Sequence, residues 1–167
     1  MRLWTVGYGA WPASVRASRM VEALRAEGIT RLVDVRINPC SSNLEPEHHY
    51  GPRPWNLQVG NAGIGGLLQG AGIAYEWLVE LGNPQRQDPS MAVLKAHLAD
   101  PEGDWPVHRG LERLAAIVRR RDESTAILCA CAKAAGCHRS VVARALSERH
   151  FDGALEIRHV GEARGRA

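Results

Sequence analysis

Short apolar runs alternate with helix-like stretches along most of the chain. Residues 2–9 form an apolar run closed by glycines, which is typical of a buried strand. Residues 13–29 space their apolar side chains as a helix does and end at Gly28, a suitable C-cap, and residues 30–36 form a second β-branched run. This order predicts a strand–helix–strand unit with two parallel strands.

The second half repeats the alternation. Strands are expected at residues 73–82, 124–132 and 154–161, and helices at 90–99, 109–121 and 137–150. The run at 124–132 is the most apolar, so it should be a central strand. Prolines and glycines crowd an irregular insertion at about 40–72, with a short helix expected around Leu67. The pattern predicts one domain, residues 1–167, of the α/β class: three layers with a mostly parallel central sheet.

Composition adds limits on compartment and partners. The 167 residues carry a formal net charge of +3, which does not by itself indicate nucleic acid. The first residues lack a secretory pattern and no apolar stretch reaches the length of a membrane span, so we expect a cytoplasmic protein with no membrane partner. Its four cysteines should then be reduced rather than paired in disulfides.

Three segments follow predicted parallel strands, at the edge where doubly wound sheets bind ligands. They are residues 7–10, 34–39 and 129–139. Side chains distant in sequence should converge there: Tyr8, Asp34, Arg36, Cys129, Cys131, Cys137, His138 and Arg139.

Four blocks carry a resemblance to a known family. "TVGYG", "LVDVRINPCS", "GIAYEWLVELG" and "ILCACAKAAGCHRSVVARAL" resemble, in this order, the bacterial and archaeal family catalogued as domain of unknown function 488. The D-V-R-x-x-P-x-S block (34–41) and the C-x7-C-H-R block (129–139) are the most specific. The resemblance implies a Rossmann-like α/β domain and leaves the activity open. The chain departs from the family pattern at Tyr8, where a histidine is usual, at Cys131, where an acid is usual, and at Ser42.

Arginines are the best candidates for holding an anion, because a guanidinium gives two parallel hydrogen bonds to phosphate or carboxylate. We assign this role to Arg36 and Arg139, together with Tyr8, Asn38 and Ser41. Asp34 shares a strand face with Arg36 and is a candidate base or orienting group. The alternative is that this aspartate–arginine pair only ties loops together.

The cysteines allow several interpretations. Cys129 and Cys131 alternate on an apolar strand, where cysteines are usually small core residues. Cys137 precedes a helix and has basic neighbours, so Cys137 and His138 are our candidate reactive pair. The spacing C-x-C-x5-C-H is not that of a zinc knuckle, and a strand should leave its cysteines little freedom to wrap an ion. We therefore expect no metal and no cofactor.

The same segment fails as a phosphatase or rhodanese-like loop, because no cysteine lies between Cys131 and Cys137 and no arginine stands at the required position. Trp55 and Trp77, with nearby tyrosines and the His48–His49 pair, raise base stacking as an alternative to core packing.

Three functions remain open. The leading hypothesis is an enzyme that acts on a phosphorylated substrate such as a nucleotide or nucleic acid, so the expected partner is a small anionic ligand or nucleic acid. The first alternative is a non-catalytic nucleic-acid-binding module. The second is a thiol-dependent transferase.

Overall fold

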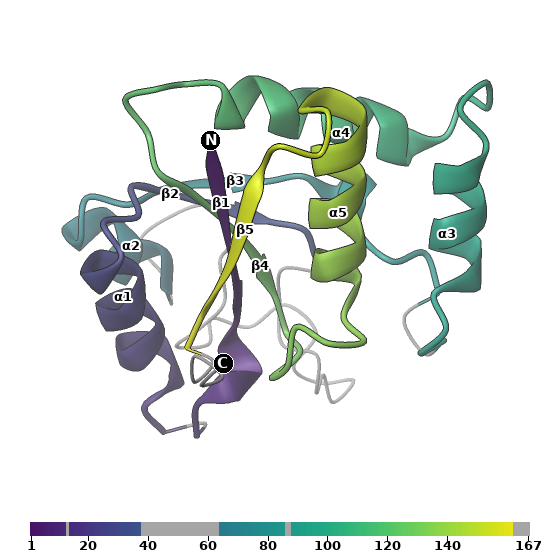
Figure 1. Ribbon diagram of the computed structural model, residues 1–167. Helices are drawn as coiled ribbons and strands as arrows, with labels where there is room; N and C mark the ends of the chain where they lie inside the picture. The colour runs from purple at the N-terminus through teal and green to yellow at the C-terminus, as the bar shows by residue number, and fades with distance from the viewer. Residues whose placement is uncertain (13, 38–63, 86–87, 162–167) are drawn as a thin grey trace, which may run out of the picture.

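The computed structural model describes residues 1–12, 14–37, 64–85 and 88–161. Its centre is a five-stranded sheet in which all paired strands run parallel, in the order β3-β2-β4-β1-β5 (Figure 1). The strands are β1 (Arg2–Gly7), β2 (Arg31–Asp34), β3 (Ala74–Trp77), β4 (Thr125–Cys129) and β5 (Glu156–Val160). The helices are α1 (Arg16–Ala26), α2 (Ile64–Gly70), α3 (Ala92–Ala99), α4 (Pro106–Val118) and α5 (His138–His150), with short 3-10 turns η1 (Tyr8–Ala10) and η3 (Val79–Leu81).

The sheet is covered on both faces, which confirms the predicted three-layer α/β class. Successive residues of a strand point to opposite faces, so Leu3 packs into the core under α4 and α5 while its neighbour Trp4 packs into the core beside α1 and α2. Figure 1 shows α1 and α2 on one side of the strands and α3, α4 and α5 on the other. The predicted short helix around Leu67 is confirmed as α2.

The most apolar run is central, as predicted. β4 lies between β1 and β2, and all five of its residues are buried. A strand flanked by two partners and covered on both faces has no solvated side, which explains its continuous apolar sequence.

Two predicted strands are shorter than the sequence indicated. The run at 73–82 supplies only four residues of the edge strand β3; Leu78 and Leu81 then turn inward at η3, and Leu81 packs against Gly110 of α4. The side chains of Leu78 and Leu81 therefore pack in the core below α4 rather than in the sheet. Likewise β1 ends at Gly7, and η1 follows.

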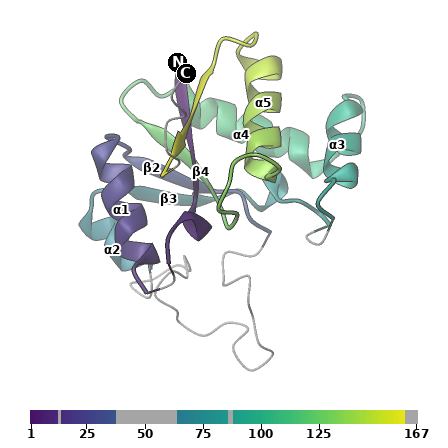
Figure 2. The same ribbon diagram turned by 60° about the horizontal axis from the view of Figure 1, so that its bottom comes forward.

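The carboxyl ends of the strands meet at one edge. Gly7 of β1 pairs with Cys129 of β4, and Asp34 of β2 pairs with Leu128. Figure 2 shows the segment after β4 turning back at this edge to the start of α5. The three predicted ligand-edge segments therefore do converge, as far as they are described; residues 38–63, which include most of the predicted insertion, lie outside the described residues. No helix among the described residues is long and apolar enough to cross a membrane.

Candidate functional site

Two glycines, Gly7 at the end of β1 and Gly9 in η1, make room for the segment that follows β4. A side chain at Gly7 would overlap the carbonyl oxygen of Cys131 and the Nη1 atom of Arg139. A side chain at Gly9 would lie 2.6 Å from the carbonyl oxygen of Ala130, which accepts a 3.1 Å hydrogen bond from the Gly9 amide. The "GYG" sequence thus allows the loop after β4 to lie directly on the end of β1.

Arg139 holds that loop from inside. Its side chain is fully buried, and its Nη1 donates to the carbonyl oxygen of Cys131 at 2.8 Å. Its Nε donates to the hydroxyl oxygen of Thr5 at 3.3 Å, and its Nη1 also lies 3.6 Å from the sulfur of Cys137. Arg139 therefore holds the backbone of Cys131 in place and puts the positive charge of its guanidinium beside the cysteines.

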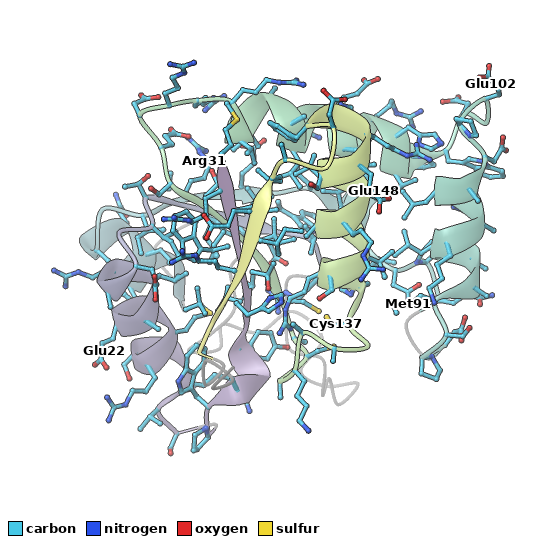
Figure 3. The ribbon with its side chains drawn as sticks, in the orientation of Figure 1. Glu22, Arg31, Met91, Glu102, Cys137 and Glu148 are labelled. Atoms are coloured by element: carbon cyan, nitrogen blue, oxygen red, sulfur yellow. The ribbon has the colours of Figure 1, made fainter. Side chains whose placement is uncertain are left out.

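Three thiols gather at this edge. The Sγ atoms of Cys129, Cys131 and Cys137 all lie within 4.8 Å of one another, and no disulfide joins them. We call these three residues the thiol cluster. Cys129 and Cys137 are buried, at 2% and 1% exposure, whereas Cys131 is exposed. Figure 3 labels Cys137 at the lower end of α5, where the loop from β4 joins the helix. Only Cys131 of the three is open to a reactant from solvent.

The three thiols do not share charge equally. Hydrogen bonds from Cys129 and then Cys137, aided by the charges of His138 and Arg139, hold the pKa of Cys131 well below the usual range for a thiol. As donors, Cys129 and Cys137 keep their protons, so their own pKa values are raised. Cys129 donates to the sulfur of Cys131 across 3.8 Å. The arrangement favours one thiolate, on the exposed sulfur, supported by two buried thiols.

His138 faces the cluster in a fixed orientation. Its Nε2 lies 2.8 Å from the carbonyl oxygen of Val35 and donates to it, and its Nδ1 lies 3.4 Å from the sulfur of Cys129. Burial alone would lower the pKa of His138, but Cys137 and the Val35 carbonyl raise it. His138 thus links the end of β2 to the thiol cluster.

Asp34 and Arg36 form a separate buried unit. Arg36 donates to both carboxylate oxygens of Asp34, from Nε at 2.9 Å and from Nη2 at 2.6 Å, and its backbone amide donates at 3.0 Å. The hydroxyl of Tyr75 donates to the same carboxylate at 3.1 Å. Asp34 is fully buried and Arg36 is 5% exposed. These contacts favour the alternative interpretation of the sequence, in which the pair ties loops together, and the Tyr75 hydrogen bond adds a link from the end of β2 to β3.

Tyr8 lies beside this pair. It is buried at η1, and the guanidinium carbons of Arg36 and Arg16 lie 5.1 and 5.3 Å from the centre of its ring. The expected face shared by Asp34 and Arg36 is present, and Tyr8 extends it to the end of β1. Asn38 and Ser41, the other candidate anion ligands, lie outside the described residues, as do Cys40, His48, His49, Tyr50 and Trp55.

A groove runs between α3 and α5 and reaches the thiol cluster. Its volume is about 840 Å³, and Cys137 and the small residues 134–136 form one end. Figure 3 shows Met91 near the lower end of α3 and Glu148 on the α5 side of this space. Lys95 of α3 and Arg144 of α5 are exposed and line the groove. Sequence reasoning missed both, because a charged residue on an amphipathic helix carries no signal that it faces a groove.

Cys131, rather than the predicted Cys137, is the accessible thiol of the cluster. The position of Cys137 before a helix made it our candidate reactive thiol, but its side chain is 1% exposed and hydrogen-bonded within the cluster. Cys131 lies beyond the last residue of β4, where the chain leaves the sheet and a side chain can reach solvent. The predicted strand, 124–132, included Cys131. A strand predicted to end at Cys129 would have placed Cys131 outside the sheet, where its side chain can be exposed.

Comparisons with known proteins identify the family. The family described as "Domain of unknown function DUF488" matches residues 52–146, which is more than half of the chain. The chain belongs to the DUF488 family. This confirms the resemblance found in the sequence, and the DUF488 match includes β4, the thiol cluster and the first part of α5. Neither the curated proteins nor the solved structures gave a match.

Proposed function

We propose that this DUF488 protein is a thiol-dependent enzyme in which Cys131 is the nucleophile and Cys129 the resolving thiol, and that its substrate is a disulfide. The observation that carries the proposal is the thiol cluster itself: one exposed cysteine beside two buried ones, all within 4.8 Å. Thiol–disulfide exchange needs an accessible attacking sulfur and a second sulfur close enough to displace the product.

The two cysteines supply the two electrons that reduce the substrate, and an external thiol restores them. The Cys131 thiolate attacks one sulfur of the substrate, forms a mixed disulfide and releases the first substrate thiolate. The sulfur of Cys129, 3.8 Å from that of Cys131, then gives its proton to solvent and attacks the Cys131 sulfur. The Cys129–Cys131 disulfide forms and the second substrate thiolate leaves. An external thiol reductant returns the enzyme to its starting state.

The surrounding residues support the role of Cys131. Arg139 and His138 place positive charge near the sulfur, which favours its thiolate form. Arg139 also fixes the backbone carbonyl of Cys131. A thiolate that is both exposed and held in place is the form that attacks an electrophilic sulfur.

A single-turnover reaction tests the proposal. One equivalent of an aromatic disulfide, whose released thiolate is coloured, is mixed with reduced and chelator-treated protein. We expect both aromatic thiolates to be released per disulfide, no stable adduct on the protein, and a Cys129–Cys131 link on peptide mapping. Cys129→Ser should stop the reaction at one thiolate and leave an adduct on Cys131.

Cys131→Ser should remove the fast phase of thiolate release. Ala132→Ser, a change at the exposed neighbouring residue, should leave this fast phase intact. A fast phase that survives Cys131→Ser would contradict the proposal. So would a wild-type adduct that stays on Cys131 unresolved.

The second candidate function is the leading hypothesis from the sequence, an enzyme that acts on a phosphate-bearing substrate. It now rests on residues other than Arg36 and Arg139. Arg36 binds Asp34 and Arg139 binds backbone carbonyls, so the described contacts of both point inward. The groove between α3 and α5 instead presents Lys95 and Arg144 to solvent. Lys95→Gln with Arg144→Gln should weaken binding of a radiolabelled nucleotide, and unchanged binding by the double variant would remove this candidate.

A further inference from the structure

We propose that the thiol cluster and His138 form a binding site for one zinc ion, and that zinc reversibly blocks the nucleophilic sulfur of Cys131. The site stands on its own geometry, while its regulatory meaning rests on the proposed thiol function. The sequence argument against a metal, that cysteines on a strand have no freedom to surround an ion, does not hold, because Cys131 lies past the strand end and Cys137 approaches from the start of α5.

Two of the distances between the ligand atoms match those of tetrahedral zinc. With a zinc–sulfur bond of about 2.3 Å and a zinc–nitrogen bond of about 2.0 Å, two sulfurs of a tetrahedral site lie about 3.8 Å apart and a sulfur and a nitrogen about 3.5 Å apart. The Sγ atoms of Cys129 and Cys131 are 3.8 Å apart, and the Nδ1 of His138 is 3.4 Å from the sulfur of Cys129. The third sulfur, of Cys137, lies within 4.8 Å of the other two.

His138 has the surroundings of a metal ligand. A histidine that binds a metal usually donates its other ring N–H to a carbonyl or carboxylate, which fixes the ring and leaves the first nitrogen facing the ion. Here Nε2 donates to the carbonyl oxygen of Val35 and Nδ1 faces the sulfur of Cys129.

Arg139 supplies a counter-charge for the zinc site. Three thiolates and one zinc ion carry a net charge of −1, which is costly to hold at a buried position without a counter-charge. Arg139 is fully buried and its Nη1 lies 3.6 Å from the sulfur of Cys137. Soft thiolate ligands with one imidazole in a tetrahedral arrangement select zinc over magnesium or calcium, which require oxygen ligands.

Zinc binding and catalysis exclude each other. The ion forms a bond to the sulfur of Cys131 and replaces the protons held by the other two thiols and by the Nδ1 of His138, which pass to solvent. The electron pair that would attack a disulfide is then occupied. Because Cys131 is exposed, a chelator or a competing thiol can reach the site from solvent and release the enzyme.

Zinc titration of reduced, metal-free protein against a chromophoric chelator tests the site. We expect one zinc ion per chain, and cobalt in its place should give the intense visible bands of a tetrahedral site with thiolate-to-metal charge transfer. Cys131→Ser and His138→Gln should each weaken zinc binding by at least the roughly 10–100-fold that loss of an outer-shell partner costs. His150→Gln, at the other end of α5, is the matched control and should bind as wild type does.

Alkylation separates this inference from the proposed function. Iodoacetamide should label Cys131 in metal-free protein, and zinc should suppress that labelling until a chelator is added. Protein that takes up no zinc but still labels at Cys131 overturns the zinc site and leaves the thiol function standing. Protein that binds zinc yet fails the single-turnover reaction when metal-free overturns the thiol function and its regulation together.

Discussion

Gly7 has no room for a side chain, and this makes it a sensitive position near the thiol cluster. A methyl group there would overlap the Cys131 carbonyl oxygen and Arg139. We expect Gly7→Ala to lower the free energy of unfolding by about 1–3 kcal/mol, the usual cost of overpacking, and to slow alkylation of Cys131. Urea unfolding and labelling kinetics measure the two effects. Gly70→Ala, at a helical position with open space around it, should neither lower the free energy of unfolding nor slow the alkylation. Equal behaviour of the two variants would refute the close packing on β1.

The buried pair of Asp34 and Arg36 predicts a larger loss of stability. In Asp34→Asn the guanidinium of Arg36 stays charged and buried but loses its counter-charge, which typically costs about 3–5 kcal/mol. Glu22→Gln, which breaks an exposed pair with Arg19, should cost less than about 1 kcal/mol. Urea midpoints compare the two variants, and a loss no greater than that of the control would show that the Asp34 carboxylate is not structural.

At the residue scale the sequence predicted which side chains meet but not what each one does. Spacing on a strand placed Asp34 and Arg36 on one face, and the carboxyl-edge rule brought them near the cysteines. Burial of Cys137 and exposure of Cys131 depend on where β4 ends, and strand ends are poorly encoded in an apolar run. The hydrogen bond from Tyr75 depends on strand pairing, which has no local signal.

At the scale of elements, β2 and β4 are joined near their amino ends by a forked ion pair. Arg31 donates to Glu123 from Nε at 2.6 Å and from Nη2 at 2.7 Å. Arg31 lowers the pKa of Glu123 below its ordinary 4.5, so the pair stabilises the fold at neutral pH. That contribution is lost only as pH falls below 4.5 and through the lowered pKa.

Glu123→Gln should therefore be less stable than wild type at pH 7, and the difference should shrink as the pH is lowered below about 4.5. Urea unfolding of both proteins across this range measures the difference. Glu27→Gln, at an exposed helix end, is the control. A difference that stays constant down to pH 3 would mean that the pair does not titrate as described.

The types of the helices and strands follow from the sequence pattern more directly than their bounds do. The periodic stretches gave the helices, and the β-branched runs gave all five strands of the described sheet. The strand predicted at 73–82 was too long because Leu78 and Leu81 are as apolar as strand residues while packing under α4. Burial alone does not tell a sequence whether an apolar residue belongs to a sheet or to a turn below a helix.

At the scale of the whole molecule, the parallel sheet brings the chemistry to one edge. β1, β2 and β4 end side by side, and the loop after β4, the start of α5 and the end of β2 meet there. The alternation of strands and helices predicted this edge, and the DUF488 match confirms the family. The disposition of the three sulfurs needed the fold, because Cys137 reaches Cys129 and Cys131 only through the turn that Gly7 and Arg139 hold in place.

Site-resolved alkylation of the native protein tests the central claim most directly. Reduced, metal-free protein is treated briefly with iodoacetamide, and each cysteine is quantified by peptide mass spectrometry. Cys131 should be labelled at least about tenfold faster than Cys129 and Cys137, because it alone of the cluster is exposed and favoured as thiolate. Labelling of Cys129 or Cys137 as fast as Cys131 in the folded protein would contradict the assignment of Cys131 as the nucleophile.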